Sequence, residues 1–263
     1  MPKVAIVAAL EREVKGLIRN WSRVERDFEG RKCAFFERDE LVMVCGGIGM
    51  ECARRAAEAV IALYCPARME SVGFAGALDD TLRVGEIFRP AEVIDARDGS
   101  RFETGRYETG HLQTGEAQRD GRLVTFMAVA GAEQKAKLAK AYRARAVDME
   151  AAAVLVAARA HGVAFSATKV ISDELDFEMP QMADFVDTAG RFKMASFVMY
   201  VALRPWLWKR VAVLARNSNK AARALSAHLE QFLCDLKKEE TLTPGTRTAA
   251  PVLSVNQVGD GRK

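Results

Sequence analysis

Residues that commonly bind metals or form disulfides are scarce in this sequence. Its three histidines, His111, His161 and His228, lie far apart and form neither an HxxxH nor an HExxH pair. We therefore expect no metal site built from them. The five cysteines are odd in number and show no CxxC spacing. This pattern is typical of buried, reduced thiols in a cytoplasmic protein, and it argues against a disulfide framework.

Apolar runs long enough to cross a membrane are also missing. The first run, residues 4–10, continues directly into Glu11, Arg12 and Glu13, so it lacks the length and the cleavage site of a signal peptide. The longest later run, residues 194–203, stops at Arg204. No segment can span a bilayer. We therefore predict a cytoplasmic protein.

Charge of one sign does not dominate the chain either. The formal net charge is +4, and Lys and Arg are interspersed with Asp and Glu. This excess is too small to indicate a protein that binds nucleic acid.

The length of 263 residues and the hydrophobic content of 49% suit one substantial domain. Near the C-terminus the sequence becomes polar and contains Pro244, Gly245, Pro251 and Gly259. We expect a single domain at residues 1–238 and a disordered tail at residues 239–263.

Strand-like and helix-like segments alternate along most of the chain. The expected strands are residues 4–10, 41–44, 71–74, 86–94 with an interruption at Pro90, 123–129 and 165–171. The expected helices are residues 11–19, 51–64, 132–142, 151–161, 195–203, 207–216 and 220–236. The polar residues 97–121 are expected to form an exposed hairpin or loop. This alternation predicts an α/β fold, a largely parallel sheet between two layers of helices.

Gly46, Gly47 and Gly49 stand between an expected strand and an expected helix. Such a turn lets the backbone approach an anion at the helix N-terminus. A tight turn without a ligand is the ordinary alternative. A dinucleotide fingerprint is not favoured, because its third glycine is absent, and no organic cofactor is expected.

Four acidic residues stand at the ends of apolar segments. Glu13 follows the first strand, Asp148 and Glu150 precede a helix, and Asp173 ends a strand. Each has an ordinary explanation, such as a favourable interaction with a helix dipole or the capping of a turn. If the strands are neighbours in a sheet, however, these carboxyl groups converge at one edge. Paired carboxyl groups of this kind are typical of enzymes that cleave glycosidic bonds.

Five segments appear in an order that resembles the nucleoside phosphorylase superfamily, in particular its branch of methylthioadenosine and S-adenosylhomocysteine nucleosidases. The segments are VAIVAALEREV at residues 4–14, GIG at 47–49, GFAGAL at 73–78 with LRVGE at 82–86, VDMEA at 147–151, and VISD at 170–173. Residues 176–218 are more similar to a subgroup that includes hopanoid-associated phosphorylases. The resemblance implies a three-layer α/β/α sandwich of the nucleoside phosphorylase type.

The resemblance also implies cleavage of the N-glycosidic bond of a purine nucleoside, with release of adenine from methylthioadenosine or S-adenosylhomocysteine. Asp173 would be a protonated general acid, and Glu13 an ionised base that activates water. Glu150 would accept hydrogen bonds from the ribose hydroxyls, and Met149 would pack on the sugar. Further substrate-binding residues are expected to be Gly47, Gly49, Phe74, Lys169 and Ser172.

Two of these residues depart from the pattern of the nucleosidases. Lys169 stands where they usually have arginine, and Phe74 stands where they usually have serine. No residue is a secure equivalent of their base-stacking aromatic side chain, since Phe126 and Met127 are more typical of core residues. Lys169 and the glycine-rich turn keep phosphorolysis open as an alternative. Glu13 favours hydrolysis, because an ionised carboxylate would repel phosphate.

The C-terminal region suggests an alternative from another class. Residues 204–238 contain eight basic and two acidic residues, together with Trp206 and Trp208. Such a region could dock peripherally on an anionic membrane and present a lipid-linked nucleoside. Packing of the tryptophans on a core is the ordinary explanation. The other expected partners are a small-molecule nucleoside and further copies of the chain, because similar proteins are usually homo-oligomers.

Overall fold

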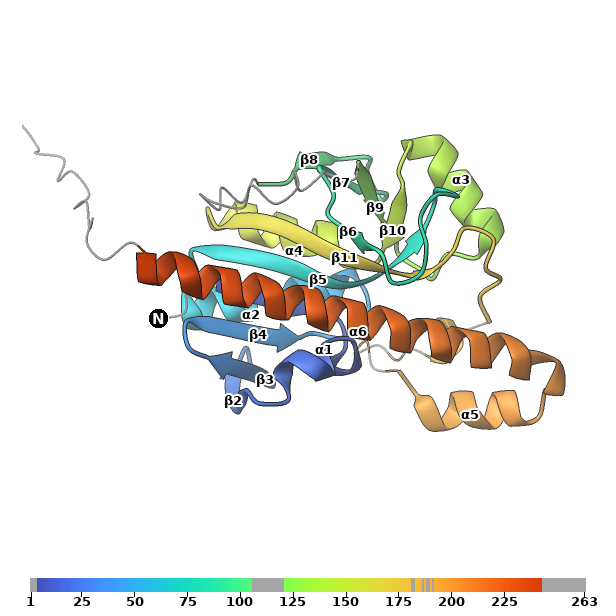
Figure 1. The fold of residues 1–263 in the computed structure, drawn as a ribbon, viewed down its shortest axis with the longest axis horizontal. Coiled ribbons are helices and arrows are strands. Elements are labelled where there is room, and N and C mark those ends of the chain that lie inside the picture. The colour runs from blue at the N-terminus through green and yellow to red at the C-terminus, as the bar shows by residue number, and fades with distance from the viewer. Residues whose placement is uncertain are drawn as a thin grey trace, which may run out of the picture.

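The computed structural model describes residues 4–105, 121–180, 183–185, 187, 190 and 192–242. In these residues the chain forms an eleven-stranded mixed sheet with helices on both faces (Figure 1). The order of the main path is β2-β3-β4-β1-β5-β10-β9-β7-β8, and β11 pairs with β5 and β6. The predicted α/β/α sandwich is confirmed.

The centre of the N-terminal half is β1 (Val4–Ala8), which pairs in parallel with β4 (Leu41–Cys45) and β5 (Arg68–Ala77). All five residues of β1 are buried, as expected of a strand covered on both faces. The antiparallel strands β2 (Ser22–Phe28) and β3 (Arg31–Arg38) extend this edge and were not predicted. Their many exposed charged residues hide the strand pattern.

The strand β5 joins the two halves of the sheet. It pairs in parallel with β11 (Ala164–Asp173) and antiparallel with β10 (Ala146–Asp148). The short β6 (Ile87–Phe88) runs antiparallel to β11. The expectation of a largely parallel sheet is therefore wrong, and the sheet is mixed.

The far edge contains β9 (Arg122–Thr125), β7 (Glu92–Asp95) and β8 (Arg101–Glu103). The strand at residues 86–94 was expected with an interruption at Pro90, and the interruption is confirmed. The two pieces, β6 and β7, pair with different strands. The strand β8 lies within the expected loop at residues 97–121, of which residues 106–120 are outside the described residues.

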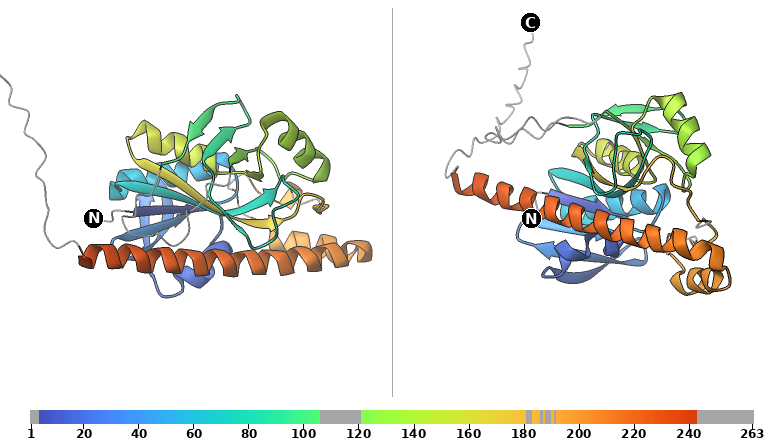
Figure 2. Two further views of the ribbon diagram at one scale, coloured as in Figure 1. Left: turned by 45° about the horizontal axis from the view of Figure 1, so that its top comes forward. Right: turned by 45° about the vertical axis from the view of Figure 1, so that its right-hand side comes forward.

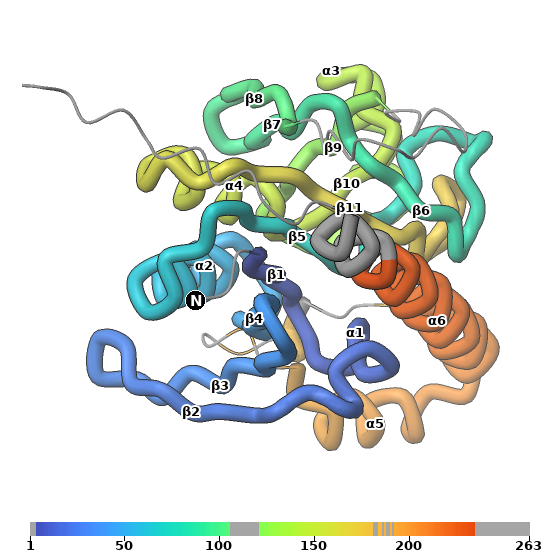
Figure 3. Tube along the Cα trace, turned by 60° about the vertical axis from the view of Figure 1, so that its left-hand side comes forward, coloured from blue at the N-terminus to red at the C-terminus, as the bar shows by residue number. Residues whose placement is uncertain are grey.

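Helices cover both faces of the sheet. They are α1 (Glu11–Ile18), α2 (Met50–Tyr64), α3 (Ala132–Tyr142), α4 (Ala151–Ala160), α5 (Met194–Ala202) and α6 (Pro205–Leu242), with a 3-10 turn at Ala183–Phe185. Figure 3 shows α1 and α6 on one side of β1 and β5, and α2 on the other. One apolar core lies under α2 and α4, and a second lies under α1 and α6.

The last helix is longer than expected. The two predicted helices at residues 207–216 and 220–236 form one continuous helix, α6, that runs across the sheet (Figure 1). Its second half is anchored to the sheet by Ala221, Leu225, Leu229 and Leu233, which are all buried. The helix continues to Leu242, so residues 239–242 are helical and not part of a disordered tail. The rest of the predicted tail lies outside the described residues, and the domain boundary stays a prediction.

The five cysteines are free, but the expectation that they are buried is wrong. Cys65 and Cys234 are exposed, and Cys33, Cys45 and Cys52 are partly buried. Burial, and then the negative charge of Glu11, raise the pKa of the Cys45 thiol.

None of the helices in the described part of the chain combines the length and the apolar character that a membrane span requires.

Candidate active site

Two cavities adjoin the turn between β1 and α1. The smaller, of about 150 Å³, lies at the carboxyl ends of β5 and β11. The larger, of about 840 Å³, extends along β3, β4 and the start of α2. Ala9, Leu10 and Arg12 line both cavities, so the two are neighbours.

Four acidic residues line the smaller cavity, and Asp148 is one of them. The other three come from distant parts of the sequence. Glu13 comes from α1, Glu150 from the junction of β10 and α4, and Asp173 from the end of β11. The strands β1, β5 and β11 are parallel, so they end at the same edge of the sheet. This edge is where open sheets with parallel strands present functional groups.

Glu13 is buried at the base of this cavity. Its Oε2 is a buried oxygen without a hydrogen-bond partner among the described residues. Burial, and then the negative charge of Glu150, raise the pKa of Glu13 to about 8. At neutral pH the carboxyl group is therefore mostly protonated, in contrast to the ionised base that we expected from the sequence.

Two glycines of β5 make room for the acidic side chains. A Cβ at Gly73 would lie 2.9 Å from Glu13 Oε2, and the φ of +145° also favours glycine. A Cβ at Gly76 would lie 2.9 Å from Asp173 Oδ2 and 3.1 Å from Cε of Lys135. Glycine at these two positions of β5 therefore leaves space for the side chains of Glu13 and Asp173.

Asp173 forms a buried ion pair with Lys135 of α3. Lys135 Nζ lies 2.5 Å from Asp173 Oδ2, and the two residues are only 1% and 3% exposed. The Ser172 hydroxyl donates to the other oxygen, Oδ1, at 2.6 Å. Lys135 also donates to the backbone carbonyl of Glu174 at 2.5 Å. Both carboxylate oxygens of Asp173 thus have partners within the protein, and its role as a general acid stays a prediction.

Glu150 precedes α4 in the chain, but its side chain reaches the N-terminus of α2. Its Oε1 accepts the backbone N–H of Gly49 at 2.9 Å, and its Oε2 accepts that of Met149 at 3.2 Å. Burial of the carboxyl group, and then the negative charge of Asp148, raise the pKa of Glu150 to about 7. The anion at the glycine-rich turn is therefore the protein's own carboxylate, which favours neither a pyrophosphate nor a dinucleotide there.

A second buried ion pair joins Asp148, which lines the cavity, to Lys169, which does not. Lys169 Nζ lies 2.8 Å from Asp148 Oδ2 and 3.1 Å from the Ser71 hydroxyl. Asp148 also accepts the Thr125 hydroxyl at 2.6 Å and the Ala151 N–H at 2.8 Å. Burial lowers the pKa of Lys169, but Asp148 and then Glu150 outweigh it and raise the pKa. Lys169 is thus a buried cation that balances the surrounding carboxylates.

The other residues predicted from the sequence divide into two groups. Those that line the smaller cavity are Phe74, Met149 and Ser172. Those that do not line it are Gly47, Gly49 and Lys169. Gly47 lines the larger cavity. Gly49 donates a hydrogen bond to Glu150, and Lys169 forms an ion pair with Asp148.

Neither candidate for base stacking lines the cavity. Phe126 packs on a small core under α3, and Met127 is exposed. Ala128, Val129 and Ala130 of the same segment line the cavity instead.

Sequence reasoning missed Lys135. Its one signal is that a cation in the first turn of a helix is unfavourable, so a lysine there needs a specific partner. It also stands one turn before Leu138, on the face of α3 that is buried. The signal is hard to recognise because Lys137 and Lys140 stand close by in the same helix and are exposed. Lys135 therefore looks like one more surface lysine.

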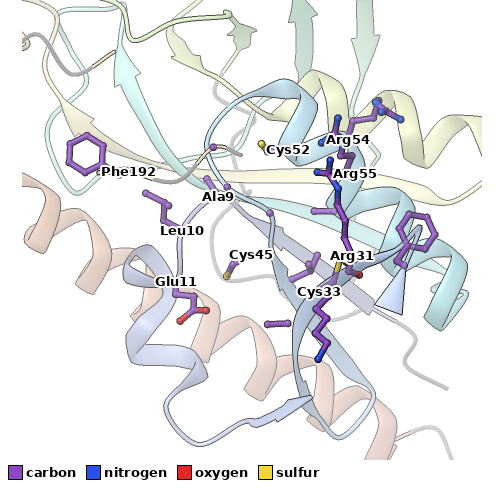
Figure 4. Close-up of a pocket in the computed structure, with 18 of the residues that line it drawn as sticks. Ala9, Leu10, Glu11, Arg31, Cys33, Cys45, Cys52, Arg54, Arg55 and Phe192 are labelled. Carbon is purple, nitrogen blue, oxygen red and sulfur yellow. Dashed lines mark hydrogen bonds between the residues drawn. The ribbon is translucent and has the colours of Figure 1, made fainter. Parts of the chain in front are cut away.

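The larger cavity has a different chemical character. Figure 4 shows Arg31, Arg54 and Arg55 gathered at one end and Phe192 with Leu10 at the other. Its lining also includes the thiols of Cys33, Cys45 and Cys52. None of the three converging acids lines it, so the smaller cavity is the candidate site of chemistry.

Among the residues that the structure describes, no group of three or more His, Cys, Asp or Glu side chains is placed to hold a metal ion.

The sequence matches one family model, the phosphorylase superfamily, over residues 3–133 and 125–202. No curated protein is significantly similar to the chain in sequence.

Several solved structures share the fold. The 5'-methylthioadenosine/S-adenosylhomocysteine nucleosidase from Helicobacter pylori, bound to butyl-thio-DADMe-Immucillin-A, aligns with a TM-score of 0.61 and 17% identity over 88% of this chain and 99% of that one. The nucleosidase from Neisseria meningitidis aligns with a TM-score of 0.58 and 21% identity, over 86% and 100%. The futalosine hydrolase of Helicobacter pylori aligns with a TM-score of 0.61 and 17% identity, over 88% and 98%.

Proposed function

The chain belongs to the phosphorylase superfamily and is an enzyme that acts on nucleosides, and from this premise we propose that it hydrolyses the N-glycosidic bond of a purine nucleoside. The substrate would be an adenosyl thioether such as methylthioadenosine or S-adenosylhomocysteine, and the base released would be adenine. The observation that carries this proposal is the convergence of Glu13, Glu150 and Asp173 on one cavity.

Glu13 would be the base that activates water. A carboxylate whose conjugate acid has a pKa of about 8 is a stronger base than an ordinary carboxylate, and it titrates near neutral pH. Water would attack C1′ of the ribose while Glu13 takes its proton. The bond from C1′ to the base would break at the same time.

Asp173 would deliver the proton that the departing base needs. The source of that proton would be Lys135, whose Nζ lies 2.5 Å from the carboxylate. We propose that Asp173 donates to N7 of the purine as Lys135 transfers its own proton to Asp173. The base then leaves neutral, and Lys135 is neutral until it regains a proton.

Glu150 would accept hydrogen bonds from the ribose hydroxyls, and Met149 would pack on the sugar. A carboxylate at this position also stabilises the positive charge that the ribose develops in the transition state. The amides of Gly49 and Met149 fix the orientation of its two oxygens.

The cavity of about 150 Å³ is smaller than the roughly 300–1,000 Å³ of typical small-molecule sites. The larger cavity adjoins it across Ala9, Leu10 and Arg12. We propose that the ribose and the base occupy the smaller cavity and that the 5′ substituent extends toward the larger one.

The proposal is tested by measuring adenine release from a panel of adenosyl compounds, with and without phosphate. We expect release without phosphate and its near loss in Glu13→Gln. Release that requires phosphate would replace hydrolysis by phosphorolysis. No release from any purine nucleoside under either condition would exclude the proposal.

Phosphorolysis stays the second candidate, and one observation favours it. With a pKa of about 8, Glu13 is largely uncharged at neutral pH, so it repels a phosphate dianion less than an ionised carboxylate would. The phosphate arm of the experiment distinguishes the two reactions.

We further propose a homo-oligomer in the cytoplasm. Light scattering after gel filtration measures the number of subunits, and a monomeric mass would contradict the first half of this prediction.

A further inference from the structure

The helix α5 is apolar on all sides but is hardly buried. Residues 194–202 contain no charged residue, and Phe197 is the only buried residue of the helix. Met199 is 64% exposed, and Met194 and Val198 are also exposed. A helix that is apolar on all sides is normally enclosed by protein or lipid.

The apolar surface continues into the start of α6. Leu203, Trp206 and Trp208 are 69%, 73% and 55% exposed. The core packing that we took as the ordinary explanation for the two tryptophans is therefore wrong. The indole N–H of Trp208 donates to the Val201 carbonyl at 3.0 Å, so its polar atom is already satisfied.

We define the hairpin patch as Met194, Val198, Met199, Leu203, Trp206 and Trp208. In Figures 1 and 2, α5 and the N-terminal end of α6 lie side by side at the edge of the molecule, away from most of the sheet. Exposed apolar groups that gather in this way mark an interaction surface.

The charge within the segment that carries the hairpin patch has one sign. The sequence contains no acidic residue between Asp187 and Glu230. Basic residues stand at both ends of α5 and at the start of α6, namely Lys193, Arg204, Lys209 and Arg210. Glu178, outside this segment, lies 3.8 Å from Arg210. The surface is therefore complementary to an anionic partner.

A second copy of the chain does not fit this surface well. A twofold contact through the patch would bring the same basic residues face to face, and they would repel one another. A nucleic acid would match the charge but not the exposed aliphatic and indole groups. Tryptophans next to lysine and arginine are typical of helices that lie in the interface of a membrane.

We propose that the hairpin patch docks this protein on the surface of an anionic lipid bilayer. The apolar side chains would enter the boundary between headgroups and acyl chains, while the basic residues contact the anionic headgroups. Docking here also orients the reaction cavity, because Leu214 and Ser218, further along α6, line that cavity.

Vesicle sedimentation tests the proposal with the full chain. We expect binding to vesicles of phosphatidylcholine and phosphatidylglycerol in a molar ratio of about 3:1, and at least about tenfold weaker binding to pure phosphatidylcholine. The tryptophan emission should shift to shorter wavelength on binding. Trp21 is buried, so this shift reports on Trp206 and Trp208.

Two double variants separate the contribution of the apolar side chains from that of the basic residues. Trp206→Ser with Trp208→Ser, and separately Lys209→Glu with Arg210→Glu, should each reduce the partition coefficient by about tenfold or more. The charge control is Lys137→Glu with Lys140→Glu, which makes the same change in net charge on the exposed face of α3. The apolar control is Val156→Ser on α4. Both controls should bind like the wild type.

Three outcomes would overturn the proposal. The first is a wild type that stays in the supernatant with anionic vesicles. The second is a loss of binding in the controls as large as in the hairpin variants. The third is a tryptophan variant that converts an oligomer into smaller species while vesicle binding is unchanged, which would make the patch an interface between copies of the chain.

Discussion

The reaction cavity and the hairpin patch are opposite exceptions to the usual distribution of residues. The cavity gathers carboxyl and ammonium groups in the interior, where charge is costly unless it is paired. The hairpin patch leaves large apolar side chains on the surface, where they contribute little to folding. Neither arrangement is expected from selection for stability alone. Under both proposals, these regions serve binding and not folding.

The two regions also differ in how their parts are held. Around the cavity, each buried acid except Glu13 has several partners, and Lys135 and Lys169 are fixed between backbone and side-chain acceptors. In the hairpin, α5 is held by ring contacts of Phe185 with Phe197 and Tyr200 and by packing on α6. Substitutions should therefore have large effects in the first region and small effects on folding in the second.

The largest effect is expected for Asp173→Asn. Without the carboxylate the proton cannot pass to the base, and adenine release should fall by about 100-fold to 10,000-fold. Asp80→Asn is the control, because Asp80 is an exposed aspartate near the same edge of the sheet. A rate close to that of the wild type in Asp173→Asn would remove this residue from its proposed role.

The next largest effect, on stability, is expected when the buried ion pair between Lys135 and Asp173 is broken. Lys135→Met leaves the Asp173 carboxylate buried without its partner, and we expect the free energy of unfolding to fall by about 3–5 kcal/mol. The double variant with Asp173→Asn should recover much of that loss. Denaturant unfolding measures both. The exposed control Lys137→Met should change stability by less than about 0.5 kcal/mol. Additive losses in the double variant would contradict a coupled pair.

The stability of the wild type should depend on pH through Glu13. Its pKa in the folded protein, about 8, is above the ordinary value of 4.5, so the protonated form stabilises the fold. That contribution is complete below about pH 4.5 and is lost as the pH rises through 8. Relative to Glu13→Gln, the wild type should lose at least about 2 kcal/mol across this range. Parallel stability curves of the two proteins would show that Glu13 titrates normally.

The smallest effect is expected from the hairpin patch. Trp206→Ser with Trp208→Ser should change the free energy of unfolding by less than about 0.5 kcal/mol, because both side chains are exposed. Leu225→Ala, on the buried face of the same helix, should cost about 2–5 kcal/mol. A tryptophan variant that unfolds as readily as Leu225→Ala would show that the patch packs on the protein.

Much of the central fold could be predicted from sequence patterns. The apolar run of β1 and the helical spacing of α1, α2 and α3 were found within a few residues of their observed bounds. The strands β2 and β3 escaped prediction, since an edge hairpin rich in charged residues has no continuous apolar run. The antiparallel pairing of β10 with β5 is set by tertiary packing, which a single sequence does not encode locally.

The sequence predicted which acidic residues lie at the site, because they stand at the ends of strands and helices. It did not predict the partners and burial of their side chains. Glu13, Glu150 and Asp173 were identified from their places at segment ends, and they share one cavity. Their roles stay a prediction. The partner of Asp173 could not be predicted, because Lys135 comes from α3, a helix that had no apparent connection with the site. The burial that raises the pKa of Glu13 likewise depends on the assembled fold.

The continuity of α6 has a geometric consequence. Its 38 residues correspond to about 57 Å at 1.5 Å per residue. The C-terminal half is fixed to the body of the protein, and the N-terminal half carries the exposed tryptophans, so the two ends cannot swivel independently. If the N-terminal end of α6 docks on a flat surface, the continuous helix would fix the tilt of the whole molecule. Ligands from that surface would then approach the reaction cavity from a constant direction.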